Sequence, residues 1–228
     1  MRIEQGMPGP AALVEAARAA GVEDERLLRV LARLPRAVFV PADATRAAYI
    51  DEPVPISHGQ VTSQPSLIAK MVEALGLSGD EKVLEVGTGY GYQTALLACL
   101  ALEVWSVELW QDMVEAAGSS LAAVGISNAH LRVGDGTCGL PEQAPFDAVV
   151  VAAAFPEVPQ PLAEQLAPYG RLVQPIGPGG AEEVCLFEKV GTKLVLKRNL
   201  TGARFVRLYG EHGYSRRDAP RGPFGLSR

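Results

Sequence analysis

The chain has 228 residues, of which 48% are hydrophobic and 21% are charged, a composition that suits one compact α/β domain. No apolar run approaches the roughly 20 residues that span a bilayer, so we expect no membrane association. The net charge of −5 removes the electrostatic attraction that drives sequence-independent binding to nucleic acid, and nucleic acid is therefore not expected as a partner.

The N-terminal part of the chain is predicted to form a helical cap on the main domain. Its first residues lack an apolar block followed by a cleavage site, so a cytoplasmic location is expected. Apolar residues recur at helical spacing and predict helices over residues 11–20, 24–34 and 65–75. Prolines between the last two helices predict an ordered connector packed on the main domain. We assign residues 1–78 to this cap and to a substrate-side loop.

From residue 82 onward, short apolar runs alternate with helical segments, which indicates βαβ units and a mostly parallel sheet. The predicted strands cover residues 82–86, 103–107, 129–133, 146–152 and 171–175. The predicted helices cover residues 92–99, 111–124 and 159–166. Two further runs, 183–190 and 193–200, meet at a Gly-Thr pair and predict an antiparallel C-terminal hairpin. We assign 79–215 to the core of a single structural domain and expect 216–228 to be a flexible tail.

A glycine loop follows the first predicted strand, with Gly87, Gly89 and Gly91 just before a helix. Glycine lets the backbone turn tightly and lets a ligand approach without meeting a Cβ atom. The dinucleotide fingerprint would need a third glycine where Tyr92 stands, and the Gly-Lys-Ser/Thr ending of a phosphate-binding P-loop is absent. An NAD-dependent oxidoreductase thus stays open as an alternative that Tyr92 disfavours.

Acidic residues follow this loop at the predicted ligand edge of the sheet. Glu108 ends the second strand about 20 residues after the loop, where a carboxylate binds ribose hydroxyls, although it could simply open the next helix. Asp135 follows the third strand and could accept from an exocyclic amine, or belong to an ordinary Asp-Gly turn. Glu85 would suit an ammonium group. A sulfonium cofactor with ribose and adenine, S-adenosylmethionine, fits this pattern better than a pyrophosphate.

Cysteines and histidines offer no recognisable metal or redox motif. Cys99, Cys138 and Cys185 lie far apart in the sequence, without a Cys-x-x-Cys pair, and the chain has only three histidines. We therefore expect neither a disulfide framework nor a metal centre.

Several segments resemble protein-L-isoaspartate O-methyltransferases. The loop VLEVGTG at 83–89 with GYQTA at 91–95 is similar to that family's cofactor loop, and the stretch 55–65 (PISHGQVTSQP) is similar to its Pro-Ile-Gly-x-Gly-Gln-Thr-x-Ser-Gln-Pro segment. The likeness continues through GDG at 134–136, PFD at 145–147, AAFPEVP at 153–159 and RFV at 204–206. It covers nearly everything from Phe39 to Tyr209.

The resemblance implies a Rossmann-like class I methyltransferase fold and a specific reaction. A methyl group passes from S-adenosylmethionine, leaving S-adenosylhomocysteine, to the free carboxylate of L-isoaspartyl residues in damaged proteins and peptides, and the ester then closes to a succinimide. It implies that Ser63 is the active-site serine and that Thr62, His58 and Val206 lie on the substrate side. The implied cofactor residues are Glu85, Gly87, Thr88, Gly89, Gln93, Glu108, Leu109, Asp135 and Gly136. A monomer is expected.

Three departures from the family pattern, Val61, Phe155 and Arg207, put the substrate preference in question. A methyltransferase for one dedicated peptide and a non-catalytic cofactor-binding scaffold therefore stay open as alternatives. Ser63 also precedes Gln64-Pro65 as the N-cap of a helix would. His58 is interpreted as structural, because a carboxylate nucleophile has no proton to remove.

The C-terminal part of the chain is basic. Residues 193–228 hold nine Lys or Arg and two acidic residues, which gives a net charge of +7. Since the whole chain has a net charge of −5, residues 1–192 have a net charge of −12. This pattern is either a solvated tail or a local attraction for acidic substrates.

Overall fold

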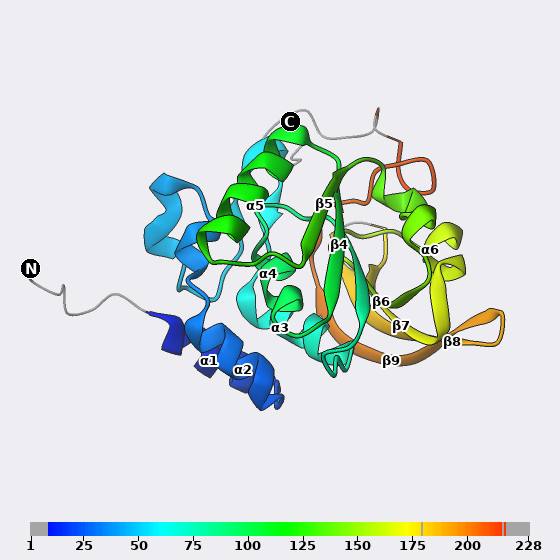
Figure 1. Ribbon diagram of the computed structural model, residues 1–228, viewed down its shortest axis with the longest axis horizontal. Coiled ribbons are helices and arrows are strands. Elements are labelled where there is room, and N and C mark those ends of the chain that lie inside the picture. The colour runs from blue at the N-terminus through cyan, green and yellow to red at the C-terminus, as the bar shows by residue number, and fades with distance from the viewer. Residues whose placement is uncertain (1–8, 179, 216, 218–228) are drawn as a thin grey trace, which may run out of the picture.

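The computed structural model describes residues 9–178, 180–215 and 217, and its central feature is a seven-stranded sheet between layers of helices (Figure 1). The strand order is β5-β4-β3-β6-β7-β8-β9. The first five strands in this order run parallel, and β8 and β9 are antiparallel. The bounds are β3 Lys82–Val86, β4 Glu103–Glu108, β5 Ala129–Val133, β6 Phe146–Val151, β7 Leu166–Ile176, β8 Glu182–Val190 and β9 Lys193–Ala203. The predicted fold class and the C-terminal hairpin are confirmed.

Alternation along the strands divides the interior into two layers. In β3, Val83 packs on one face of the sheet and Leu84 on the other. The face of Val83 is covered by the N-terminal helices and by the two crossover helices nearest to them, whereas α6 and two short helical turns cover the face of Leu84. The helices are α1 Pro10–Ala19, α2 Glu25–Arg33, α3 Pro65–Ala74, α4 Tyr92–Ala98, α5 Gln111–Ala123 and α6 Gln160–Glu164.

The connector between α2 and α3 is ordered, as predicted, and a buried arginine organises it. It contains the 3-10 turns η1 (Arg36–Phe39), η2 (Ala42–Ala47) and η3 (Ser57–Gly59), and the strands β1 (Val54–Pro55) and β2 (Val61–Thr62) pair antiparallel. The guanidinium of Arg36 is fully buried and donates to the carbonyl oxygens of Ala48, Ile50, Glu52 and Ser63 at 3.1–3.2 Å. This one side chain therefore links the end of η2, the loop at 50–52 and the segment after β2.

The predicted helix 159–166 and strand 171–175 are both wrong in their bounds. The helix α6 ends at Glu164, and β7 already begins at Leu166. Pro168 cannot continue a helix, and Tyr169 has a φ of 63°, so β7 is irregular where Leu166 pairs with Phe146 and Arg171 with Ala148. A strand with such an interruption does not show the alternation that predicts strands.

Among the described residues, no helix combines the length and the apolar character needed to cross a bilayer. The predicted flexible tail, 216–228, lies outside the described residues apart from Arg217.

Candidate functional site

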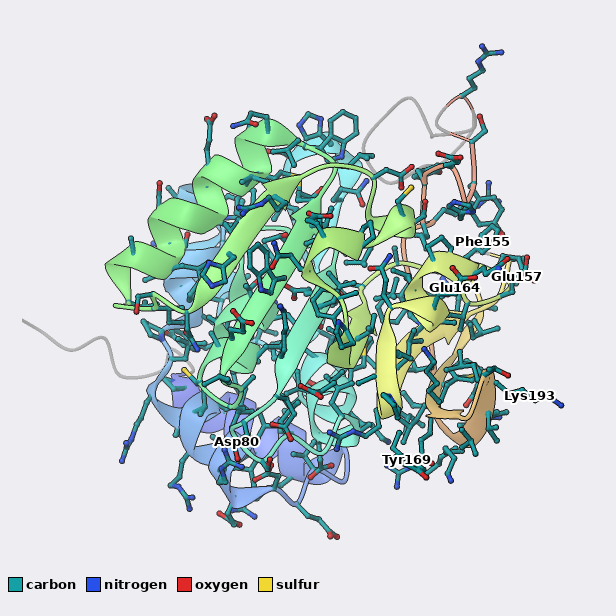
Figure 2. All side chains as sticks on the ribbon, turned by 45° about the vertical axis from the view of Figure 1, so that its right-hand side comes forward. Asp80, Phe155, Glu157, Glu164, Tyr169 and Lys193 are labelled. Carbon is teal, nitrogen blue, oxygen red and sulfur yellow. The ribbon has the colours of Figure 1, made fainter. Side chains whose placement is uncertain are left out.

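The carboxyl ends of the parallel strands meet at one edge of the sheet, and the predicted site residues follow these ends. From β3 the chain runs outward through β4 to β5 and then crosses back to β6 on the other side of β3, so the reversal of strand order lies between β3 and β6. Open α/β sheets bind their ligands at such a point. Phe155 follows the carboxyl end of β6, and Asp80 precedes the amino end of β3. Figure 2 shows them on opposite sides of the molecule, so Phe155 marks the side of the carboxyl ends.

The glycine loop lies directly over this reversal. Gly87 and Gly89 adopt φ values of 96° and 56°, which side chains disfavour, and a Cβ atom on Gly87 would lie 3.3 Å from that of Ala152. The Gly87 amide donates to the carbonyl of Val107 at 2.9 Å, and the Thr88 hydroxyl lies 2.5 Å from that of Ser106. The loop therefore joins the ends of β3, β4 and β6.

Glu85 lies beneath the loop rather than on its surface. Its carboxylate is fully buried and accepts from Gln93 at 3.0 Å, Thr94 at 2.5 Å and Ser106 at 2.6 Å. Burial raises the pKa of Glu85 to about 7, although these three hydrogen bonds act in the opposite direction. Direct contact with a cofactor ammonium stays a prediction, and the geometry favours a role in fixing α4 under the loop.

Glu108 at the end of β4 joins the glycine loop to the segment that follows the strand. Its carboxylate is 7% exposed and accepts from the amides of Gly89 at 3.0 Å and Leu109 at 2.6 Å. Burial raises the pKa of Glu108 against the effect of these backbone donors. The Trp110 amide donates a third, longer hydrogen bond at 3.4 Å. Since a carboxylate has about four acceptor positions, Glu108 retains about one for a ligand hydroxyl.

Asp135 and Gly136 follow β5 and are already engaged within the protein. One oxygen of Asp135 accepts from the amide and the hydroxyl of Thr137 at 2.9 and 2.6 Å, and the other accepts from the Glu211 amide at 2.7 Å. A Cβ atom on Gly136 would lie 2.4 Å from a methyl of Val86, so glycine is required where this turn crosses the end of β3. Contact between Asp135 and an exocyclic amine stays a prediction.

The segment around His58 contacts both the glycine loop and the residues that follow β4. The hydroxyls of Ser57 and Tyr90 lie 2.9 Å apart, which links η3 to the glycine loop. The His58 ring stacks on Trp110 with centroids 4.0 Å apart, and its Nε2 atom lies 2.9 Å from a carboxylate oxygen of Asp112. These are the contacts of a structural residue, and they place the substrate-side loop against the glycine loop.

Ser63 does not cap α3, so the alternative that made it an N-cap is wrong. The N-cap is Gln64, and the carboxylate of Asp51 instead accepts from the amide and the hydroxyl of Ser66 at 2.8 and 2.7 Å. The Ser63 carbonyl accepts from Arg36, while its hydroxyl, partly exposed, has no hydrogen-bond partner within the described part of the chain. Thr62, its neighbour in β2, is 8% exposed.

Two of the three departures from the family pattern contact one aromatic ring. Phe155 meets Tyr214 edge to face with centroids 5.2 Å apart, and the guanidinium of Arg207 lies 4.9 Å from the centre of the same ring. The residues on either side of Arg207 are tied to the chain leaving β6, because the Val206 carbonyl accepts from Ala154 and the Leu208 amide donates to Ala154, both at 2.8 Å. Phe155, Arg207 and Tyr214, which we call the Tyr214 cluster, therefore lie beside the sheet reversal.

Four residues that the sequence pattern did not single out contribute to this site: Arg36, Asp51, Tyr90 and Ser106. A signal existed for Ser106, because it is a polar residue in the apolar middle of β4 and pairs in register with Glu85. Arg36 and Asp51 gave no such signal. Arg36 donates to backbone carbonyls 12–27 residues away, and Asp51 accepts from groups of Gln64 and Ser66, 13 and 15 residues away.

The sheet is doubly wound, and its first loop is rich in glycine but lacks the residues of a phosphate-binding loop. Acidic residues follow the ends of the next two strands. Together these features define a Rossmann-like class I methyltransferase core. A model of the family described as protein-L-isoaspartate(D-aspartate) O-methyltransferase matches residues 10–213. The chain belongs to this family.

Individual relatives and solved structures agree with that assignment. A protein from Anaeromyxobacter dehalogenans named protein-L-isoaspartate O-methyltransferase is 50% identical over 190 residues, which cover 82% of this chain and 91% of the relative. One of the same name from Methanoculleus marisnigri is 46% identical over 204 residues, covering 89% and 92%. A solved structure of that name superposes with a TM-score of 0.78 at 29% identity, covering 90% of this chain and 67% of the other.

A Plasmodium falciparum structure supports the fold alone. It is described as a protein-L-isoaspartate O-methyltransferase in complex with S-adenosyl-L-homocysteine, and it superposes with a TM-score of 0.72 at 22% identity, covering 88% of this chain and 98% of the other.

Proposed function

We propose that the chain transfers a methyl group from S-adenosylmethionine to the free carboxylate of L-isoaspartyl residues in damaged proteins and peptides. Membership of the family supports the reaction. The observation that carries the proposal is the attachment of the Ser63 segment, through Ser57 and His58, to the glycine loop and to the end of β4. That attachment supports a site in which the Ser63 hydroxyl faces the substrate and the glycine loop holds the cofactor.

The loop fits a cationic cofactor on chemical grounds. No Lys or Arg stands between Glu85 and Gln93, whereas the carboxylates of Glu85 and Glu108 are close enough for the charge of Glu108 to raise the pKa of Glu85 further. When bound, S-adenosylmethionine supplies a methyl group activated by its sulfonium. The proposed ligands are the loop residues Gly87, Thr88 and Gly89, with Gln93 beneath them, Glu108 and Leu109 for ribose and its surroundings, and Asp135 and Gly136 toward the base.

The chain's own residues act by binding and orientation rather than by acid–base chemistry. A carboxylate nucleophile is already ionised at neutral pH, so no general base is needed. The Ser63 hydroxyl is free to donate to it and to hold one oxygen in line with the methyl group, which is a positioning effect. Thr62, His58 and Val206 are proposed to shape the substrate side of the site, with His58 acting through its contacts with Trp110 and Asp112.

We further propose that the chain works as a monomer in the cytoplasm. Its three cysteines are free thiols, which suits a reducing compartment. The outer strand β9 carries Lys193, Lys197 and Arg198, and charged side chains on an edge strand discourage pairing with a second chain. Light scattering at micromolar concentration is expected to give the monomer mass, and a dimer mass would contradict this part of the proposal.

The reaction is tested with two peptides of identical sequence that differ only in an aspartyl or an isoaspartyl linkage. The protein is incubated with methyl-labelled S-adenosylmethionine, and base-labile methanol is counted from each peptide. We expect labelled methanol from the isoaspartyl peptide alone. Equal counts from both peptides, or none from either, would overturn the proposal, and cofactor binding without ester formation would favour a non-catalytic scaffold.

A further inference from the structure

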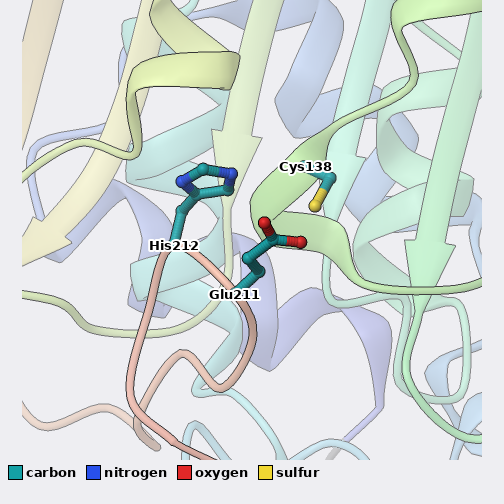
Figure 3. A group of neighbouring side chains, drawn as sticks. All are labelled: Cys138, Glu211 and His212. Carbon is teal, nitrogen blue, oxygen red and sulfur yellow. The ribbon is translucent and has the colours of Figure 1, made fainter.

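Three possible metal ligands from distant parts of the chain meet beside the cofactor edge. Cys138 ends the 3-10 turn η4 (Gly136–Cys138), and Glu211 and His212 lie in the turn after Tyr209. One ligand atom from each lies within 4.8 Å of the others, and Figure 3 shows the Glu211 carboxylate directed toward the Cys138 thiol with the His212 ring alongside. Sequence spacing predicts no metal centre here, because the usual motifs place their ligands a few residues apart.

The turn that contains Glu211 and His212 is held against η4 by hydrogen bonds that do not involve the side chains of Cys138, Glu211 or His212. The amide of Glu211 donates to Asp135 at 2.7 Å, and that of His212 donates to the hydroxyl of Thr137 at 3.1 Å. A Cβ atom on Gly210 would lie 2.1 Å from an Asp135 oxygen, so the turn sits as closely on η4 as glycine allows. The ligand backbone is thus largely preorganised, which lowers the cost of binding an ion.

The local electrostatics favour a cation. The negative charges of Asp135 and Glu211 both act on the position of the Cys138 thiol, so a cation is favoured there. Within the described part of the chain, the Glu211 carboxylate and the His212 ring have no hydrogen-bond or ion-pair partner. Both are therefore available as ligands.

We propose that Cys138, Glu211 and His212 form a binding site for a Zn²⁺-class divalent cation, with water in the fourth position. Thiolate, imidazole and carboxylate are the protein ligands that zinc prefers, at about 2.0–2.3 Å from the ion. Such bonds bring ligand atoms to within roughly 3–4 Å of one another, so small side-chain rotations suffice. On binding, the thiol releases its proton to solvent and the sulfur coordinates as thiolate.

The bound ion would fasten the turn at 210–213 to η4, whose first residue is the predicted cofactor residue Gly136. The site itself is independent of the methyl-transfer reaction. Only its consequence, slower exchange of the cofactor when the ion is bound, rests on the proposed function.

The test uses the reduced full-length protein titrated with Co²⁺, whose absorption spectrum reports thiolate coordination, and with Zn²⁺ against a competing chelator. We expect one equivalent of Co²⁺ with a thiolate charge-transfer band. Cys138→Ser is expected to abolish the band, and His212→Gln and Glu211→Gln are expected to weaken Zn²⁺ binding by at least about tenfold. Cys99→Ser, which alters an exposed thiol elsewhere, is the matched control and is expected to match the unchanged protein.

Three results would overturn the site: no band in the unchanged protein, a band that survives in Cys138→Ser, or a band lost in Cys99→Ser. Thermal melts with and without Zn²⁺ give an independent readout, because an ion that binds only the folded state raises the melting temperature. That increase is expected to vanish in Cys138→Ser. None of these measurements involves methyl transfer, so they fail or succeed separately from the proposed reaction.

Discussion

At the scale of single residues, Ser63 and Ser66 have different roles near the start of α3. Ser66 stabilises the helix, and Ser63 is the predicted site residue. Asp51 binds the amide and hydroxyl of Ser66 and so stabilises the start of α3. Among the residues that the structure describes, the hydroxyl of Ser63 has no hydrogen-bond partner, so it is available to a ligand. These two serines therefore form a matched pair for separating stability from activity.

Ser63→Ala is expected to lower kcat by about tenfold or more, because one orienting hydrogen bond to a charged group contributes roughly 1.5–3 kcal/mol. Its unfolding free energy and cofactor affinity should stay nearly unchanged. Ser66→Ala is expected to do the reverse, costing about 1 kcal/mol of stability with turnover retained. Steady-state kinetics and urea unfolding of both variants check this, and a Ser63→Ala protein that is unstable but active would show that the assignment is wrong.

Glu85 predicts a pH dependence of stability. Its folded-state pKa of about 7 lies above the ordinary value of 4.5, so between these values the native protein holds a proton that the unfolded chain has released. Rising pH therefore lowers the free energy of unfolding across that window, by about 3 kcal/mol at 1.36 kcal/mol per pKa unit. Glu85→Gln should remove this component, whereas the exposed Glu115→Gln should keep it. Urea unfolding from about pH 4.5 to pH 8 measures the slopes, and identical slopes for Glu85→Gln and the unchanged protein would contradict the prediction.

At the scale of the elements, Arg36 determines whether the connector has one shape. A desolvated guanidinium that donates to four carbonyl groups cannot be replaced by an ammonium, which carries three donors on a single atom. Arg36→Lys is expected to cost about 2–4 kcal/mol of stability, since it leaves buried acceptors unpaired. It should also lower kcat, because the Ser63 carbonyl loses its donor. Exposed Arg33→Lys is the control, and comparable values for the two variants would contradict this role.

Most elements could be predicted from the sequence because their signals are local. The strand 82–86 and the glycine loop were readable from an apolar run and from the glycine spacing, and the predicted bounds of β3 and β5 agree with the structure. The start of β7 was not readable, because Tyr169 interrupts its alternation. The assignment of Ser63 to the site is still a prediction, and it comes from the likeness to a known family rather than from any spacing. Arg36 and Asp51, which support the site, escaped prediction because their hydrogen-bond partners lie 12 or more residues away in the sequence.

At the scale of the whole molecule, the basic C-terminal part meets the ligand edge at the Tyr214 cluster. Arg207 is exposed and lies on the ring of Tyr214, whose hydroxyl donates to the Pro178 carbonyl at 2.8 Å. This arrangement holds a cation beside the sheet reversal. We therefore expect a preference for substrates with acidic residues next to the isoaspartyl linkage.

Arg207→Ala is expected to lower kcat/KM several-fold for peptides with an acidic neighbour, roughly the 0.5–1 kcal/mol of an exposed charge pair, and to change it little for neutral peptides. The difference should shrink at high salt. Lys193→Ala, at the tip of the β8–β9 hairpin, serves as the control (Figure 2). Competition between the two peptides at low and high ionic strength checks this, and an equal loss for both peptides would contradict charge recognition.

The attachment of the connector has a consequence for how the protein is made. The ribosome synthesises the stretch from Arg36 to Ser63 first. Residues that this stretch contacts in the rest of the domain, Tyr90, Tyr92 and Trp110, are synthesised later. The stretch can make its own contacts through Arg36 and the β1–β2 pair, but it can complete its attachment only after Trp110, just before the second crossover helix, has emerged. A chain that ended before that point would contain Ser63 but would lack the residue on which His58 stacks, so we expect such aborted translation products to be inactive.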